Sequence, residues 1–182
     1  MVGTGIQMRI FVVFSLLQGL MANRFVNRDM VGASHDVICP ISQAKPNFNI
    51  DLFMGHWYIL EYQYPREMKL TDLSCLSFDF NAAGEDIVGN FSFRYPPRFG
   101  HYYHIPTVSN VIANGQEGLW MTSFKGVSLL SGIVDTDYEN WAVFVQCVNE
   151  SGENKFMSTR VLSRTRDLSP QDWLTVREAI QV

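Results

Sequence analysis

The sequence carries little charge, and its positive charge is sparse. Charged residues make up 18% of the 182 residues, and 14 Lys and Arg against 18 Asp and Glu give a net charge of −4. The basic side chains are scattered, which argues against a nucleic-acid-binding protein, because such a protein needs a basic stripe to displace counterions. The three Cys form no Cys-x-x-Cys pair and the four His have no zinc-binding spacing, so we expect neither a metal site nor a cofactor.

Apolar and aromatic residues are abundant instead. Hydrophobic residues make up 47% of the chain and aromatic residues 13%. This composition excludes a disordered chain and predicts a folded core. The length suits one ordinary domain.

A short apolar run follows Arg9 near the N-terminus. Residues 10–22 read Ile-Phe-Val-Val-Phe-Ser-Leu-Leu-Gln-Gly-Leu-Met-Ala, which is too short to span a bilayer comfortably and is preceded by a positive charge. We therefore predict a secretory signal peptide over residues 1–22, an extended lead-in over 23–46, a folded domain over 47–182, and a secreted, extracellular protein. An uncleaved anchor and a buried helix are the alternatives, and the cleavage point is poorly defined.

Secretion changes the interpretation of the cysteines and of two short motifs. In an oxidising compartment Cys39, Cys75 and Cys147 are disulfide candidates, and an odd number leaves one of them over. The Asn-x-Ser sequons at Asn90 and Asn149 become candidate glycosylation sites.

The chain from Trp57 onward consists of short β-rich runs separated by turn residues. Eight such runs at about ten-residue spacing predict an antiparallel barrel or sandwich. The expected strands are Trp57–Tyr64, Cys75–Asn81, Ile87–Tyr95, His101–Ala113, Leu119–Phe124, Leu129–Asp137, Trp141–Val148 and Lys155–Ser163.

A helix is expected at the C-terminal end. Ser169 is a favourable N-cap and Pro170 a favourable first helical residue, and Trp173, Val176 and Ile180 then follow at helical spacing. One amphipathic helix after eight strands would pack on the outside of the sheet.

Two of the expected strands are apolar on both faces. Residues 141–147 and 57–60 show no clear alternation of apolar and polar side chains. Such strands either have both faces covered or line an apolar barrel interior. An eight-stranded barrel is wide enough for one small ligand, and a filled core is the alternative.

Three segments together resemble the lipocalin family. Residues 47–58 resemble the first lipocalin motif with its Gly-x-Trp, residues 136–142 resemble the second motif with Trp141 in place of the usual Tyr, and residues 162–165 resemble the third motif with Arg164. The resemblance covers residues ~39 to 182 and is closest to the apolipoprotein D and insect bilin-binding branch.

The resemblance implies a fold and a function. The fold is an all-β, eight-stranded antiparallel up-and-down calyx barrel with one C-terminal α-helix packed outside. The function is to bind and carry a small hydrophobic ligand (a lipid, a pigment or a retinoid-like molecule) and not to catalyse a reaction. The motif residues are implied to be structural, with Arg164 stacked on Trp57 at the closed end of the barrel; they are Gly55, Trp57, Thr136, Asp137, Tyr138 and Arg164.

Strand alternation suggests which side chains face the barrel interior. Glu61 is the unusual member of this set, because a carboxylate inside an apolar barrel needs a partner or a raised pKa. A bulge that turns Glu61 outward is the alternative. The ligand-binding candidates are Ile59, Glu61, Leu129, Ser131, Ile133, Ala142 and Phe144.

The resemblance also implies a Cys39–Cys147 disulfide. Cys75 matches a position that is paired in the family with a cysteine in the C-terminal tail, and this sequence has no Cys after Cys147. One explanation is that the sequence is truncated or a variant; the other is a free thiol used for chemistry or for a disulfide-linked dimer.

Two other functions remain open. The loops at the open end are aromatic and could bind a lipoprotein, a membrane or a receptor, with the barrel as scaffold. Cys75 could instead be the nucleophile of an isomerase, because one lipocalin enzyme carries a catalytic Cys in its second strand. Asp79 would raise the pKa of a nearby thiol, which disfavours the enzyme.

Overall fold

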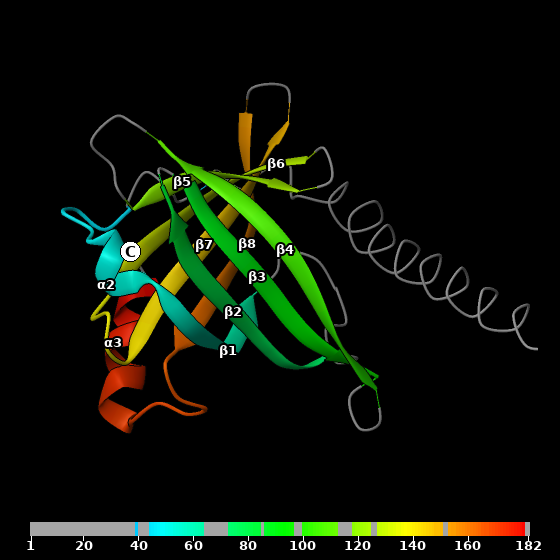
Figure 1. The fold of residues 1–182 in the computed structure, drawn as a ribbon. Coiled ribbons are helices and arrows are strands. Elements are labelled where there is room, and N and C mark those ends of the chain that lie inside the picture. Colours follow the sequence, from blue (N-terminus) through cyan, green and yellow to red (C-terminus); the bar gives the residue numbers. More distant parts are fainter. Residues whose placement is uncertain are drawn as a thin grey trace, which may run out of the picture. The chain divides into compact units, whose positions relative to one another are not determined.

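Eight antiparallel strands in the described part of the chain close into one barrel, in which each strand pairs with its neighbours in sequence and β8 pairs back with β1 (Figure 1). This computed structural model describes residues 39, 44–63, 73–84, 86–96, 100–112, 118–124, 127–150 and 153–180. The predicted signal peptide and most of the predicted lead-in lie outside the described residues. The strands are β1 Gly55–Gln63, β2 Ser74–Ala83, β3 Asp86–Tyr95, β4 His101–Val111, β5 Leu119–Phe124, β6 Val127–Thr136, β7 Trp141–Glu150 and β8 Glu153–Ser163.

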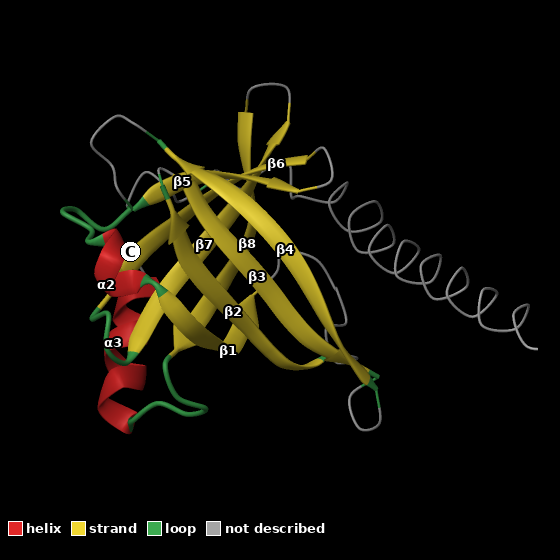
Figure 2. Ribbon diagram, viewed as in Figure 1, coloured by secondary structure: helices red, strands yellow, loops and turns green. Residues whose placement is uncertain are grey.

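The predicted up-and-down barrel is therefore confirmed, as is its C-terminal helix. Helix α3 spans Pro170–Ile180 and begins after Ser169, whose hydroxyl oxygen accepts a 3.1 Å hydrogen bond from the Asp172 backbone N–H. Val176 of α3 is buried on the outside of the barrel against Trp141 and Val143. Figure 2 shows this helix and the one-turn helix α2 (Ile50–Phe53) beside the strands.

Apolar side chains lie on both faces of the sheet. The inner face holds the largest group of buried side chains, which includes Phe78, Phe144 and Leu162. On the outer face, Leu130 and Val145 pack around the Cys39–Cys147 disulfide, whose Cα atoms are 6.0 Å apart. Strand β7 is thus apolar on both faces because each face of the sheet is covered there.

A β-bulge corrects the expected orientation of Glu61. Ile59 pairs with Leu162, but Glu61 pairs with Val161, so the register shifts between them. An extra residue in one strand reverses the alternation beyond it. Tyr62 consequently faces the interior, and Glu61 faces α3 on the outside.

Candidate functional site

Trp57 and Arg164 form the centre of the closed end of the barrel. The Arg164 guanidinium carbon lies 3.7 Å from the centre of the Trp57 ring. The same guanidinium donates hydrogen bonds to four backbone carbonyls in three segments, those of Leu52, Phe53, His56 and Tyr138. Partial burial lowers the pKa of Arg164. The predicted stacking is confirmed, and Arg164 also joins α2 to the turn after β6.

Gly55 is required where β1 begins beneath this arginine. Its φ is +105°, which side-chain-bearing residues rarely adopt, and a Cβ there would lie 3.2 Å from Arg164 Nη1.

The turn between β6 and β7 is organised by Asp137. One of its carboxylate oxygens accepts hydrogen bonds from the backbone N–H groups of Glu139, Asn140 and Trp141. Burial alone would raise the pKa of Asp137, but the bonds from Trp141, Asn140 and Glu139 outweigh it and lower the pKa below its ordinary value.

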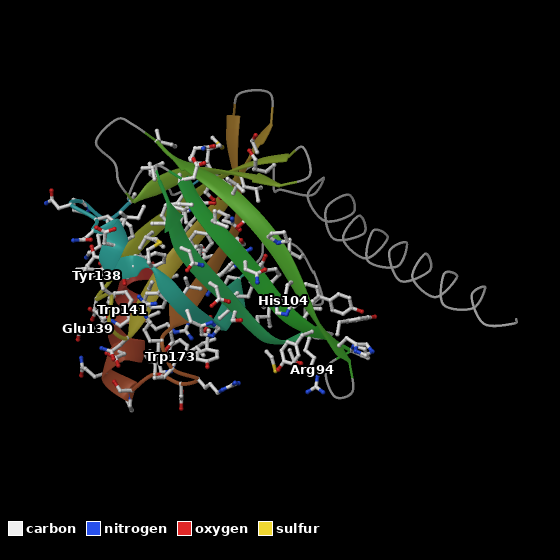
Figure 3. All side chains as sticks on the ribbon, in the orientation of Figure 1. Arg94, His104, Tyr138, Glu139, Trp141 and Trp173 are labelled. Carbon is white, nitrogen blue, oxygen red and sulfur yellow. A yellow bond between two sulfur atoms is a disulfide. The ribbon has the colours of Figure 1, made fainter. Side chains whose placement is uncertain are left out.

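Thr136 and Tyr138 complete this turn. The Thr136 hydroxyl donates to the Trp141 carbonyl over 2.6 Å and accepts from the Tyr138 N–H over 2.8 Å. Figure 3 shows Tyr138 and Trp141 at the end of the barrel beside α2 and α3. The contacts of these motif residues are structural.

Aromatic rings fill the interior directly above this closed end. Trp57 and Phe53 stack with centroids 5.0 Å apart, and Trp120 and Phe144 stack at 5.9 Å. We call this layer the aromatic floor; it consists of Phe48, Phe53, Trp57, Phe78, Phe80, Trp120 and Phe144.

A row of polar side chains follows the inner face above the aromatic floor. Consecutive members come from adjacent strands and are joined by hydrogen bonds: Ser109 to Thr122 at 2.9 Å, Thr122 to Ser131 at 3.0 Å, Gln146 to Ser131 at 3.0 Å, and Arg160 to Gln146 and Tyr62. We call this row the polar belt; it runs through β4, β5, β6, β7, β8 and β1.

Arg160 is the only charged side chain of the polar belt. It is 6% exposed, and its guanidinium carbon lies 4.7 Å from the Tyr62 ring centre, 5.4 Å from that of Phe78 and 5.5 Å from that of Phe144. Because these rings belong to three different strands, the guanidinium lies over the barrel interior.

Solved structures with a similar fold are known, although no protein-family model and no curated protein sequence matches this chain. The amine-binding protein of Rhodnius prolixus, solved as its tryptamine complex, has a TM-score of 0.63 at 22% identity, over 76% of this chain and 76% of that one. Insecticyanin of the tobacco hornworm Manduca sexta has a TM-score of 0.61 at 17% identity, over 82% and 78%. Lobster apocrustacyanin A1 has a TM-score of 0.59 at 15% identity, over 80% and 84%. The chain has the lipocalin fold.

Most of the predicted ligand-binding candidates lie on the inner face of this lipocalin barrel. Ile59, Ile133, Ala142 and Phe144 belong to the inner apolar cluster. Ser131 is a member of the polar belt. Leu129 is buried and shares the face of Ser131 by strand alternation. That these residues bind a ligand stays a prediction.

Glu61 is the exception and was predicted wrongly. Its two carboxylate oxygens accept hydrogen bonds from Arg177 of α3 at 2.9 and 2.6 Å. The hydrogen bond from Arg177 lowers the pKa of Glu61, where an interior position would have raised it. Glu61 therefore helps to hold α3 on the outside of the lipocalin barrel.

The remaining predicted positions lie at the surface of the barrel. Cys75 is free and exposed, and its hydrogen bond with Tyr102 raises the pKa of that tyrosine. Asn90 lies in β3, half-buried on the outer face. The side chain of Asn149 lies outside the described residues. Glycosylation and a dimer through Cys75 stay predictions.

Four members of the polar belt were missed by the sequence analysis. Ser109, Thr122 and Arg160 lie at strand positions whose side chains alternate towards the interior. Arg160 lies two residues before the inward-facing Leu162, so alternation would have identified it. Tyr62 was missed because no sequence signal marks the bulge in β1.

Within the described residues, no group of side chains is arranged to hold a metal ion, and neither helix is long and apolar enough to cross a membrane.

Proposed function

We propose that this chain is a secreted, non-enzymatic carrier that binds a small, largely apolar ligand inside the barrel, between the polar belt and the open end. The observation that carries the proposal is the inner face itself. It carries a large cluster of apolar side chains together with a short row of polar groups, which is the composition typical of small-molecule sites.

The amine-binding protein of Rhodnius prolixus supports this proposal, because a protein of similar fold was solved in complex with a small molecule, tryptamine. The position of Cys75 supports a carrier over an isomerase. Its thiol is exposed, whereas a ligand in the interior would meet Phe78, which follows three residues later in β2. A nucleophile must reach the bound molecule to react with it.

Native mass spectrometry of the secreted, deglycosylated protein tests the proposal. We expect an excess mass that disappears on denaturation, since the ligand is not covalently attached. The variant Leu129→Trp places a bulky ring on the inner face and should reduce the fraction of ligand-bound protein. The matched control Leu174→Trp lies on the exposed face of α3, where Leu174 is 61% exposed, and should leave that fraction unchanged. If neither the native protein nor protein mixed with a panel of apolar compounds shows excess mass, the proposal is wrong.

A further inference from the structure

We propose that the ligand is an apolar acid whose carboxylate binds Arg160. This inference rests on the proposed carrier function and specifies the chemistry of its ligand. It follows from the charge, the burial and the unused hydrogen-bond donors of one residue.

The charge of Arg160 has no opposite charge near it among the side chains that the structure describes, which do not include those of residues 149–157. Its hydrogen-bond acceptors are the neutral Gln146 amide and the neutral Tyr62 hydroxyl. No described inward-facing strand side chain carries a carboxylate: Asp79 bonds His56 on the outer face, Asp135 bonds Lys45, and Glu61 bonds Arg177. Burial of a charge is costly unless the charge is paired, and the aromatic faces around Arg160 compensate only part of that cost.

The donors of Arg160 are also incompletely used. A guanidinium has five N–H donors, and Nε of Arg160 has no hydrogen-bond partner in the structure. The Ser158 hydroxyl has no partner either; it is fully buried, two residues from Arg160 on the same face of β8, and opposite Gln146 in the register. A guanidinium and a hydroxyl on the same face of one strand can together bind a carboxylate, which accepts several hydrogen bonds and binds arginine in a fixed geometry.

The surroundings of Arg160 determine how such an acid would lie. The aromatic floor below the polar belt is closely packed, so the acid would enter with its carboxylate first and leave its tail towards the open end. Apolar inner-face residues on that side include Leu129, Val148, Phe91 and Phe93. A ligand with one acidic end and an apolar tail matches this order of groups.

The same charge disfavours a cationic ligand. The protein of Rhodnius prolixus is an amine-binding protein solved with tryptamine, and tryptamine carries an ammonium group at neutral pH. An ammonium group beside Arg160 would be repelled, and no described inward-facing carboxylate compensates for it. We therefore expect this barrel to select the opposite sign of charge.

Fluorescence titration with cis-parinaric acid and with its methyl ester tests the inference. The two probes share one apolar tail and differ in charge. We expect the native protein to bind the acid about 10- to 100-fold more tightly than the ester, which is the range of a charge-assisted hydrogen bond. Arg160→Met should bring the two affinities together while the ester affinity stays within about threefold. The control Arg166→Met removes an exposed arginine that lies over Tyr58 and should preserve the preference for the acid.

The outcomes separate this inference from the proposed function. If native protein binds neither probe nor any other apolar compound, the carrier function itself is wrong. If it binds both probes equally, the carrier function stands and the role of Arg160 is overturned. The same conclusion follows if Arg160→Met keeps the acid preference of the native protein. Because the comparison of acid and ester on native protein needs no variant, the inference remains testable even if Arg160→Met fails to fold.

Discussion

Arg164→Ala should destabilise the protein far more than removal of an exposed arginine. Arg164 lies 3.7 Å from the Trp57 ring centre and donates to four backbone carbonyls. The stacked pair contributes about 0.5–2 kcal/mol. Two of the four bonds, to Phe53 and Tyr138, are partly buried, and each contributes about 1 kcal/mol. The other two are exposed, so water can replace them. The expected loss in the free energy of unfolding is therefore about 2.5–4 kcal/mol.

Urea denaturation of the oxidised protein, followed by tryptophan fluorescence, measures this loss. Arg166→Ala is the matched control, because Arg166 stacks on the Tyr58 ring at 4.8 Å but is exposed; it should cost less than about 1 kcal/mol. Arg164→Lys keeps the charge but loses the planar fork, and should fall between the native protein and Arg164→Ala. Equal midpoints for Arg164→Ala and Arg166→Ala would refute the idea that Arg164 holds the closed end together.

Three further predictions concern the disulfide, Asp137 and Glu61. Replacement of Cys39 and Cys147 by Ser should cost about 2–5 kcal/mol in urea unfolding, because the bond closes a loop of 108 residues; an unchanged midpoint would contradict this. The pKa of Asp137 is lower in the folded protein than its ordinary value of 3.8, so the ionised carboxylate stabilises the fold at neutral pH. This contribution should be lost as the pH falls from 3.8 through the lowered pKa. Acid unfolding of Asp137→Asn should therefore depend less on pH than that of the native protein. Glu61→Gln should weaken the docking of α3, seen as faster amide exchange in that helix, with no change in the affinity for an apolar probe; a change in affinity would place Glu61 in the ligand site.

The fold was predictable because its signals are local and mutually consistent. The turn residues between strands, the capping Ser169 and the three motifs each specify a piece of local structure, and all agree with one barrel. The structure confirms the stacking of Arg164 on Trp57 and the Cys39–Cys147 disulfide, which the resemblance implied.

The interior was predicted less completely, since its details depend on register. Alternation placed Ile133 and Phe144 correctly because β6 and β7 are regular along these positions. It failed at Glu61 because a single extra residue in β1 reverses the faces, and no residue type marks that bulge. The polar belt was missed as a unit because its members lie on six strands, so that they meet only when the barrel closes.

Methyl NMR of the protein titrated with an apolar ligand tests the central claim, that the ligand binds inside the barrel, most directly. Leu129 and Ile133 have their methyl groups on the inner face, whereas Leu52 and Leu174 are 57% and 61% exposed on the outside. With cis-parinaric acid as ligand, we predict saturable shifts of the Leu129 and Ile133 methyl signals and none at Leu52 or Leu174. Shifts confined to the outer methyl groups, with the inner signals unchanged at saturation, would contradict the account.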